Sequence, residues 1–246
     1  MIAMKQQEQQ EQQEQQEQKF QTFNTNLGTL FLGDCKEMLK MLPTALVDVV
    51  ITDPPWGVGY DEYDDFNRFI DIRDELYRVM KDNSWLLLYL YTKRIYDLLP
   101  YYEIGFQYKW LIPCIYTGFM TRTRNTLGSQ SAYTLVVVLA KGKPKLQTRR
   151  RDVIFVDELP FVEGKINEPQ FKPTYTTAML LYMFTKSNDV ILDPFVGYGS
   201  IPLVCEYFNR RWIGIEISKE RFNIAKEIIS KKKVIDIKRL KKSLQV

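Results

Sequence analysis

The chain contains two short apolar runs that each end in an Asp-Pro turn, and these runs strongly limit how it can fold. Residues 47–52 lead into Asp53-Pro54-Pro55-Trp56, and residues 190–192 lead into an Asp-Pro-Phe-Val-Gly-Tyr-Gly-Ser turn at 193–200. Strands that are apolar on both faces are typical of parallel sheets covered by helices. In open α/β sheets, loops at the carboxyl ends of such strands hold ligands and catalytic groups. The two loops therefore predict one site for a cofactor and one for a substrate amine.

Predicted strands and helices alternate along the rest of the chain. Hydrophobic periodicity predicts strands at residues 27–33, 85–90, 106–116, 132–140 and 211–216, and helices at residues 65–80, 93–99, 173–186, 200–207 and 218–230. This alternation indicates an α/β fold with a doubly wound, mostly parallel sheet. The long strands at 106–116 and 132–140 are expected to form an antiparallel hairpin on the edge of the sheet. Ser218 is expected to cap the last helix.

Composition divides the chain into one domain and two tails. Residues 1–24 are rich in Gln and Glu and are predicted to form a disordered tail, with folded structure starting near Thr25. Residues 25–232 are expected to form a single domain, in keeping with a chain of 246 residues. Residues 233–246 are predicted to form a basic C-terminal tail.

Residue usage excludes several kinds of chemistry. The chain has no histidine, which excludes a histidine base, a Ser-His-Asp triad and histidine-ligated metals. Cys35, Cys114 and Cys205 form no CxxC pair, which argues for a reducing compartment and against a zinc or disulfide framework, so no metal is expected. No signal peptide or membrane-spanning apolar run is visible, so the expected location is the cytoplasm, or the host cytoplasm for a virus-encoded protein. A net charge of +4 permits a nucleic-acid partner without requiring one.

The turn at 193–200 has the features of a cofactor-binding loop between a strand and a helix. Gly197 and Gly199 allow the backbone to approach a ligand closely, and Ser200 is expected to cap the following helix. Pro202 stands where a dinucleotide-binding GxGxxG motif needs a third small residue, which disfavours an NAD(P)-dependent oxidoreductase. The next predicted strand ends at Glu216, a place where a carboxylate commonly binds ribose hydroxyls.

These motifs, in this order, resemble the DNA amino-methyltransferases of the permuted β group. Those enzymes use S-adenosylmethionine (SAM) and carry a DPPY or DPPW segment before an FxGxG segment. The resemblance extends from Gly28 to about Lys231, and it implies a Rossmann-like, seven-stranded SAM-methyltransferase sheet with a circularly permuted motif order. Tyr198 and Ser200 depart from the more usual Ser and Thr, and Glu-Pro-Gln-Phe at 168–171 replaces the common His-Pro-Thr-Gln.

The resemblance also implies a set of cofactor contacts. The methionine side of SAM is expected to lie against the turn at 193–199 and its ribose near Glu216. Its adenine is expected near Asp34 and its carboxylate near Lys172. The implied cofactor-binding residues are Asp34, Lys172, Asp193, Pro194, Phe195, Gly197, Gly199, Ser200 and Glu216.

The Asp53-Pro54-Pro55-Trp56 segment suits chemistry on the exocyclic amine of a base. Such an amine is a poor nucleophile because its lone pair is delocalised into the ring. Asp53 can accept one N–H and the Pro54 carbonyl the other, which favours a pyramidal nitrogen and stabilises the charge that develops. The consecutive prolines Pro54 and Pro55 stiffen the loop, and Trp56 offers an aromatic face for a base taken out of the duplex. These four are the predicted catalytic residues.

The Asp-Pro-Pro-Trp motif favours N6 of adenine by resemblance, because N4-cytosine enzymes more often carry Ser-Pro-Pro-Tyr. The predicted reaction is in-line methyl transfer from SAM to adenine N6 in DNA after base flipping. Methylation of cytosine N4, or of adenine in RNA, remains an alternative at the same site. An inactive SAM-fold module that only binds nucleic acid is an alternative of a different class.

Residues from about 117 to 170 are expected to include a small target-recognition region. Arginine can read guanine edges, asparagine can read adenine, and lysine mostly contacts phosphate. The predicted nucleic-acid contacts are Tyr60, Arg122, Arg124, Asn125, Lys141, Lys143, Arg149 and Arg150. The expected partner is double-stranded DNA, and no membrane contact is expected. The sequence leaves open a homodimer, and it does not say whether a partner restriction nuclease exists.

Overall fold

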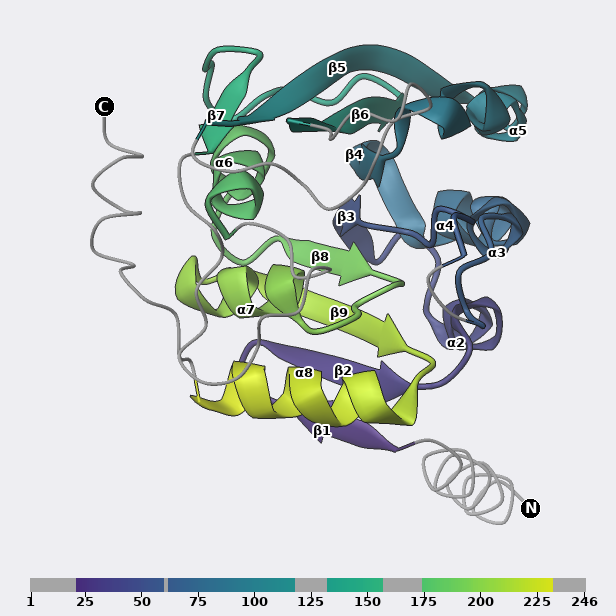
Figure 1. The fold of residues 1–246 in the computed structure, drawn as a ribbon, viewed down its shortest axis with the longest axis vertical. Helices are drawn as coiled ribbons and strands as arrows, with labels where there is room; N and C mark the ends of the chain where they lie inside the picture. The colour runs from purple at the N-terminus through teal and green to yellow at the C-terminus, as the bar shows by residue number, and fades with distance from the viewer. Residues whose placement is uncertain (1–20, 60–61, 118–131, 157–173, 232–246) are drawn as a thin grey trace, which may run out of the picture.

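A computed structural model describes residues 21–59, 62–117, 132–156 and 174–231, which form one mixed sheet with helices packed against it (Figure 1). In the described residues the sheet has nine strands in the order β1-β2-β9-β8-β3-β4-β6-β5-β7. Strands β2, β9, β8, β3 and β4 are mutually parallel, whereas β6 is antiparallel to both of its neighbours. The strands are β1 (Thr22–Asn24), β2 (Gly28–Leu32), β3 (Val47–Thr52), β4 (Met80–Leu90), β5 (Phe106–Tyr116), β6 (Tyr133–Lys141), β7 (Ile154–Val156), β8 (Val190–Asp193) and β9 (Arg211–Glu216).

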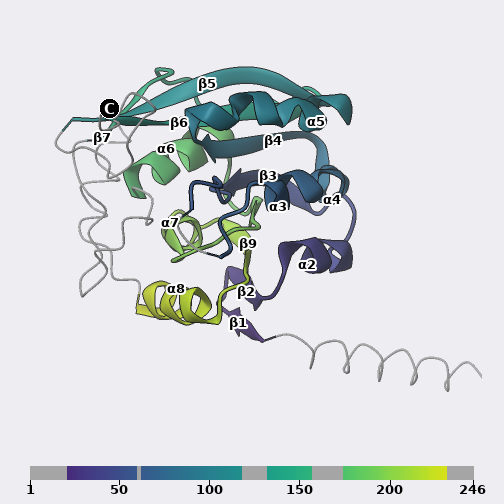
Figure 2. The same cartoon turned by 45° about the vertical axis from the view of Figure 1, so that its right-hand side comes forward.

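Helices cover both faces of this sheet, as predicted for a doubly wound fold (Figure 2). One face carries α2 (Cys35–Met41), α3 (Asn67–Asp71), α4 (Arg73–Val79), the 3₁₀ helix η1 (Thr92–Leu98) and α5 (Leu99–Glu103). The other face carries α6 (Thr174–Phe184), α7 (Ser200–Tyr207) and α8 (Lys219–Lys231). None of the helices in the described ranges is long and apolar enough to cross a membrane.

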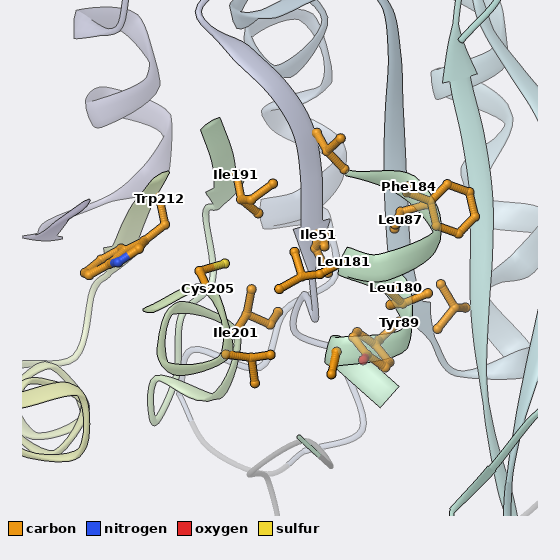
Figure 3. Packing of buried hydrophobic residues seen from close by; sticks show 14 of the residues in the cluster. Ile51, Leu87, Tyr89, Leu180, Leu181, Phe184, Ile191, Ile201, Cys205 and Trp212 are labelled. Atoms are coloured by element: carbon orange, nitrogen blue, oxygen red, sulfur yellow. The ribbon is translucent and has the colours of Figure 1, made fainter. Parts of the chain in front are cut away.

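Alternate side chains of the central strands fill two cores, one under each helical layer. In β3, Ile51 joins the core shared with α6 and α7, whereas Val50 joins the core shared with α2 and α4. Figure 3 shows part of the first core, to which Ile51 of β3, Leu181 of α6 and Ile201 of α7 all belong. Full burial of a large aliphatic side chain contributes about 1.5–3 kcal/mol. The apolar character of β3 on both faces therefore fixes it in the middle of the sheet.

The chain leaves the neighbouring strands β3 and β8 in opposite directions. After β3 it passes through α3 and α4 to β4, on one side of β3 in the sheet. After β8 it passes through α7 to β9, on the other side of β8 and along the opposite face. Such a reversal of winding opens a crevice beyond the carboxyl ends of the two strands, where α/β proteins bind ligands. Both Asp-Pro turns lie at this point.

Three expectations about the limits of the sheet are wrong. The count of seven strands misses β1 and β7, which have three residues each and are too short to show a periodic pattern. The antiparallel hairpin of β5 and β6 is one strand in from the edge, because β7 pairs with β5. In the described residues, regular structure is already present at Thr22, before the expected start near Thr25, because β1 pairs with β2.

Helix boundaries also differ from the predicted ones. The predicted helix at 65–80 is two helices that meet at Ile72, where the backbone departs from helical values (φ −94°, ψ 2°). The predicted helix at 93–99 is η1 followed by α5, which accepts Pro100 because proline is tolerated in a first turn. Ser218 caps α8 by accepting a hydrogen bond from the Arg221 amide at 3.4 Å, as predicted. Ser200 does not cap α7, because Gly199 is the N-cap and Ser200 is already helical.

The three cysteines are buried thiols, one in each layer of the fold. Cys35 lies on α2, Cys114 in β5 and Cys205 on α7. Burial is the main cause that raises the pKa of the Cys35 thiol to about 12, and burial also raises the pKa of Cys205. A buried thiol with a raised pKa is a poor nucleophile, so these side chains act as part of the apolar core.

Candidate active site

The two Asp-Pro turns lie side by side because β3 and β8 are neighbours, with Val50 level with Leu192. Thr52, the last residue of β3, donates a hydrogen bond from its hydroxyl to Asp193 Oδ1 at 2.8 Å. Both side chains are buried, so water does not compete for this bond. The bond joins residues 141 positions apart and ties the two turns together at their base.

Asp193 is a buried carboxyl group, 2% exposed, at the start of the glycine-rich turn. Its Oδ1 accepts hydrogen bonds from Thr52 and, at 3.1 Å, from the Phe195 amide. Its Oδ2 is buried and has no hydrogen-bond partner among the described residues. Burial raises the pKa of Asp193 from 3.8 to about 7, and the nearby charges of Asp53 and Glu216 add to the shift. A cationic N–H donor at Oδ2 would satisfy this oxygen and favour the carboxylate.

Glu216 ends β9 and holds the glycine-rich turn from the other side. Its Oε2 accepts a hydrogen bond from the Gly197 amide at 2.7 Å, and its Oε1 accepts one from the Ser218 amide at 2.8 Å. Burial raises the pKa of Glu216, and these two hydrogen bonds oppose the increase. Each carboxylate oxygen keeps a second acceptor position, which suits a ligand hydroxyl.

The two glycines of the turn serve different purposes. Gly197 and Gly199 have φ values of 56° and 87°, a region that favours glycine. A methyl group added at Gly199 would lie 3.1 Å from Cβ of Ala225 on α8, so Gly199 allows α7 to begin against α8. A methyl group added at Gly197 would meet nothing within 4 Å. Gly197 therefore borders open space next to the carboxylate of Glu216.

The remaining predicted cofactor residues of the described chain lie at the same edge. Asp34 is held there because β2 pairs with β9, with Leu32 level with Glu216. Asp34 Oδ1 accepts from the Lys36 amide at 2.8 Å and caps α2, and its Oδ2 accepts from Arg68 at 2.8 Å. Pro194 and Ser200 are buried, and Phe195 packs edge-on against Phe69. No group of three or more Cys, Asp or Glu side chains in the described residues is arranged to hold a metal ion.

Asp53 lies in a partly exposed position among buried polar groups. Burial is the main cause of the raised pKa values of Tyr89, Tyr116 and Asp193. The negative charge of Asp53 adds a smaller contribution to each of these shifts. Asp53 directly follows β3, which pairs with β8, the strand that ends at Asp193. Tyr89 is fixed by a hydrogen bond of 3.2 Å between its hydroxyl and that of Thr177 on α6. The catalytic aspartate predicted from sequence thus lies beside the predicted cofactor aspartate.

The ring of Trp56 is supported by a residue that the sequence did not single out. Trp56 stacks on Tyr91, with ring centroids 5.8 Å apart and an interplanar angle of 14°. Arg94, in η1, donates a hydrogen bond to the Trp56 carbonyl at 2.8 Å. Sequence reasoning also missed Thr52, for which a hydroxyl residue at the end of a mainly apolar run was the only signal. Tyr91 and Arg94 carried no signal, because their contacts depend on how η1 folds back.

Lys141, a predicted nucleic-acid contact, uses its ammonium group inside the fold. Its ammonium group is largely buried and donates to the carbonyls of Tyr77 and Met80, each at 2.8 Å. It also lies 4.4 Å from the centroid of the Tyr77 ring. Lys141 is level with Ser84 near the start of β4, about 15 Å along the strands from the Asp-Pro turns. The side chain therefore joins α4 to β6.

Three other basic residues were predicted to contact nucleic acid, namely Lys143, Arg149 and Arg150. Lys143 follows Lys141, and its amide donates to the Asn83 side chain at 2.8 Å. The guanidinium of Arg150 lies 5.1 Å from the centroid of the Tyr182 ring on α6. Arg149 is exposed next to it. Their predicted role toward DNA stays a prediction.

Five predicted site residues lie outside the described part of the chain, namely Tyr60, Arg122, Arg124, Asn125 and Lys172. The strands on either side of residues 118–131 are described. Ile115 near the end of β5 is level with Tyr133 at the start of β6. This level lies beyond the pairing of Leu90 with Leu135, at the carboxyl end of β4. Strand β5 therefore ends, and β6 begins, at the edge of the sheet that carries Asp53.

Comparison with known proteins identifies the family of this chain. A family model described as DNA methylase (N6_N4_Mtase) matches residues 47–227. The Type II methyltransferase M.HpaI of Haemophilus parainfluenzae is 27% identical over 80% of this chain and 73% of its own length. The structure of the M1.HpyAVI–SAM complex has a TM-score of 0.67 at 22% identity, covering 82% of this chain and 98% of that one. PvuII DNA methyltransferase, titled cytosine-N4-specific, has a TM-score of 0.64 at 16% identity, covering 90% and 93%.

The family match extends over both Asp-Pro turns and over the strands that hold them. It begins at Val47, the first residue of β3, and ends at Glu227 in α8. It therefore covers well over half of the chain and includes the carboxyl ends of β3 and β8. The chain belongs to the N6_N4 family of DNA methylases.

Proposed function

We propose that this DNA methylase transfers the methyl group of SAM directly to the exocyclic N6 amine of adenine in double-stranded DNA. The observation that carries the proposal is the adjacency of two carboxyl groups at the crevice between β3 and β8. Asp53 directly follows β3, Asp193 ends the neighbouring strand β8, and the Thr52 hydroxyl joins the two strand ends. An amine held at Asp53 would therefore meet a cofactor held at Asp193, which supports direct transfer.

The residues around Asp193 fit SAM. SAM supplies an electrophilic methyl group on a positively charged sulfonium. Asp193 Oδ2 offers a buried acceptor for its ammonium group, and Glu216 offers acceptor positions for its ribose hydroxyls. The open space beside Gly197 leaves room for the ligand. Asp34 and Lys172 stay the proposed contacts to the adenine and carboxylate ends.

Asp53 and the Pro54 carbonyl act on the target amine. Each accepts one N–H, which draws the nitrogen lone pair out of the ring and stabilises the positive charge that develops during transfer. The two proline rings restrict this part of the backbone, so the acceptors need little reorganisation when the base arrives. These roles rest on residue type and position at the end of β3.

The carboxylate of Asp53 supports adenine as the target base. The N4-cytosine enzymes that this chain resembles more often carry serine at this position, with different acceptor chemistry. The fold alone does not discriminate, because the cytosine-N4-specific PvuII enzyme shares it. Cytosine N4 is therefore the alternative at the same site.

The target base reaches Asp53 only outside the duplex, so the proposal includes base flipping. The Trp56 ring, supported by Tyr91, supplies a stacking face for the extruded base. Arg122, Arg124 and Asn125 are the proposed target-reading residues, because the strands on either side of their segment end at the edge that carries Asp53. Lys141 is not among the proposed contacts.

Incubation of the purified protein with labelled SAM and unmethylated double-stranded DNA, followed by nucleoside analysis, tests the proposal. N6-methyladenine is the expected product. Label in N4-methylcytosine would keep the reaction and correct the base, and transfer only to RNA would correct the nucleic acid. Calorimetry without detectable SAM binding would instead favour a nucleic-acid-binding module.

Alanine substitutions at the two glycines are expected to have different consequences. Gly197→Ala should weaken SAM binding about tenfold or more, because the methyl group enters the open ligand space, and should cost only about 1 kcal/mol of folding free energy. Gly199→Ala should lower the free energy of unfolding by about 1–3 kcal/mol, because its methyl group presses on Ala225. Calorimetric titration and denaturant unfolding measure the two effects. If Gly197→Ala binds SAM with wild-type affinity, SAM does not occupy the space beside Gly197.

Glu216→Ala is expected to weaken SAM binding by about 1–3 kcal/mol, the cost of losing a charged hydrogen-bond acceptor. The substitution also removes the acceptor of the Gly197 and Ser218 amides, which loosens the turn. Glu216→Gln keeps the side chain in place and should lose less affinity. Titration calorimetry with SAM compares the variants, and equal affinity in all three proteins would exclude Glu216 from the site.

A further inference from the structure

The η1 segment packs directly on the turn that carries the proposed catalytic residues. It follows β4, the strand next to β3, so it begins at the same edge of the sheet as Asp53. Tyr91, just before η1, stacks on the Trp56 ring. Arg94, within η1, contacts the backbone of the same turn. One short segment therefore supports both the ring and the main chain of the turn.

Arg94 uses all three of its guanidinium nitrogens. Its Nε donates to the Trp56 carbonyl at 2.8 Å, and its Nη2 donates to the Gly57 carbonyl at 3.3 Å. Its Nη1 donates to Asp97 Oδ2 at 3.0 Å, which orients the guanidinium plane. The group also lies 5.3 Å from the centroid of the Phe66 ring. A planar fork that serves three acceptors in fixed directions is a property of arginine that lysine lacks.

The amide groups of the same turn are bound by a second side chain, that of Asp64. Asp64 accepts hydrogen bonds from the Gly57 and Val58 amides, each at 2.8 Å. Gly57 has a φ of 64°, and a methyl group added there would lie 2.5 Å from Nη2 of Arg94. Arg94 and Asp64 thus fix consecutive peptide groups directly after Trp56, and glycine at position 57 lets the guanidinium approach.

We infer that Arg94 is a positioning residue for methyl transfer, which holds Asp53, the Pro54 carbonyl and the Trp56 ring in their reactive arrangement before the base arrives. The inference rests on the methylase activity of the family and not on which base is methylated. Arg94 touches neither reacting group and acts through the carbonyls of Trp56 and Gly57. Preset acceptors lower the barrier because the turn does not have to order itself around the substrate.

Arg94→Ala is expected to lower kcat about 10²-fold, because small displacements of reacting groups have effects of this size, while the SAM dissociation constant stays within about twofold. Arg94→Lys should recover only part of kcat, since an ammonium group cannot serve the three acceptors together. Arg73→Ala is the matched control. Arg73 is as exposed as Arg94 (34% against 32% of the side chain) but contacts Asp74 and the Ile70 carbonyl. Its kcat should equal that of the wild type.

Gly57→Ala tests the same contact by changing the turn instead of Arg94, because the added methyl group displaces the guanidinium. It should also lower kcat, and combining it with Arg94→Ala should add little further loss, since both changes break one interaction. Hydrogen exchange of the full-length protein without DNA gives a readout that needs no activity. The Gly57 and Val58 amides should exchange faster in Arg94→Ala than in the wild type.

Wild-type kcat and KM for DNA in Arg94→Ala would overturn the inference. The inference would also be overturned if Arg94→Ala lost SAM affinity and unfolded at a lower midpoint in proportion to its loss of activity. Those results would indicate general destabilisation of the protein. If the wild-type protein does not methylate DNA, the proposed function is wrong instead. In that case the hydrogen-exchange comparison would still decide whether Arg94 orders the turn.

Discussion

Asp53→Asn is expected to lower kcat for methyl transfer by about 10²- to 10³-fold, the usual cost of removing one preorganised group that stabilises developing charge. The amide keeps the size of the side chain but loses the negative charge, and its NH₂ group cannot accept a proton or a hydrogen bond. Asp53→Ala should lose at least as much. Single-turnover transfer of labelled methyl groups to DNA measures both variants.

SAM affinity separates this role from general damage to the site. The charge of Asp53 contributes to the raised pKa of Asp193, so its removal should lower that pKa and leave the cofactor carboxylate at least as well ionised at neutral pH. SAM should therefore bind Asp53→Asn as tightly as it binds the wild type. Asp71→Asn, an exposed change on α3, serves as the control for substitution of an aspartate. Near-normal turnover in Asp53→Asn would refute the assigned role.

SAM affinity is expected to fall steeply as the pH drops through 7. The pKa of Asp193 in the free protein is about 7, raised mainly by burial, and a cationic ligand needs the ionised form. Below that pH the dissociation constant should rise by up to about tenfold per pH unit, because each binding event must release a proton. Titration calorimetry at pH 6 and pH 8, in buffers of different ionisation enthalpy, measures the affinity and the released proton together.

Asp193→Asn is the matching variant, and it should weaken SAM binding at pH 8 by about 10²-fold, in line with the loss of a buried charged partner. Its remaining affinity should not change between pH 6 and pH 7.5. An unchanged pH dependence in this variant would assign the titration to another group. The amide oxygen can still accept from Thr52 and Phe195, so the fold of the turn should persist.

The same carboxyl group makes the free protein less stable at high pH. Its pKa when folded, about 7, lies above its ordinary value of 3.8. Its contribution to stability is therefore fully present below about pH 4 and is lost as the pH rises through about 7. Asp193→Asn should accordingly unfold at a higher temperature than the wild type at pH 8 in the absence of SAM. If Asp193→Asn is more stable than the wild type but binds SAM more weakly, then Asp193 lowers the stability of the free protein and strengthens cofactor binding.

The fold was predictable because β3 and β8 are apolar on both faces and end in turns with strong composition signals. Such strands fit only the middle of a helix-covered sheet, and the alternation of helices and strands set the winding. The strands at the two edges of the sheet were harder to predict from the sequence. Strands β1 and β7 have three residues each and owe their place to pairing with longer neighbours, which no local pattern reports.

The sequence predicted the site residues that lie next to the end of a strand. It did not predict the residues that reach the site because a later segment of the chain folds back onto an earlier turn. Asp53, Asp193 and Glu216 follow or end apolar strands, so their common edge could be expected. The contact of Arg94 with Trp56 joins residues 38 positions apart and becomes visible only when η1 is placed. Lys141 was assigned to DNA because it starts a basic run, but its place in β6 directs its ammonium to the carbonyls that end α4.

The three native cysteines can be used as probes of partial unfolding, because they lie in different layers of the fold. Cys35, Cys114 and Cys205 sit in one helical layer, the sheet and the other helical layer. Each thiol becomes reactive only when its surroundings open, so the rate of its modification by a thiol reagent reports the free energy of that opening. Mass spectrometry of the labelled peptides would then rank the layers by local stability in the unaltered chain. Repeating the labelling with SAM present would show how far stabilisation at the crevice extends into each layer.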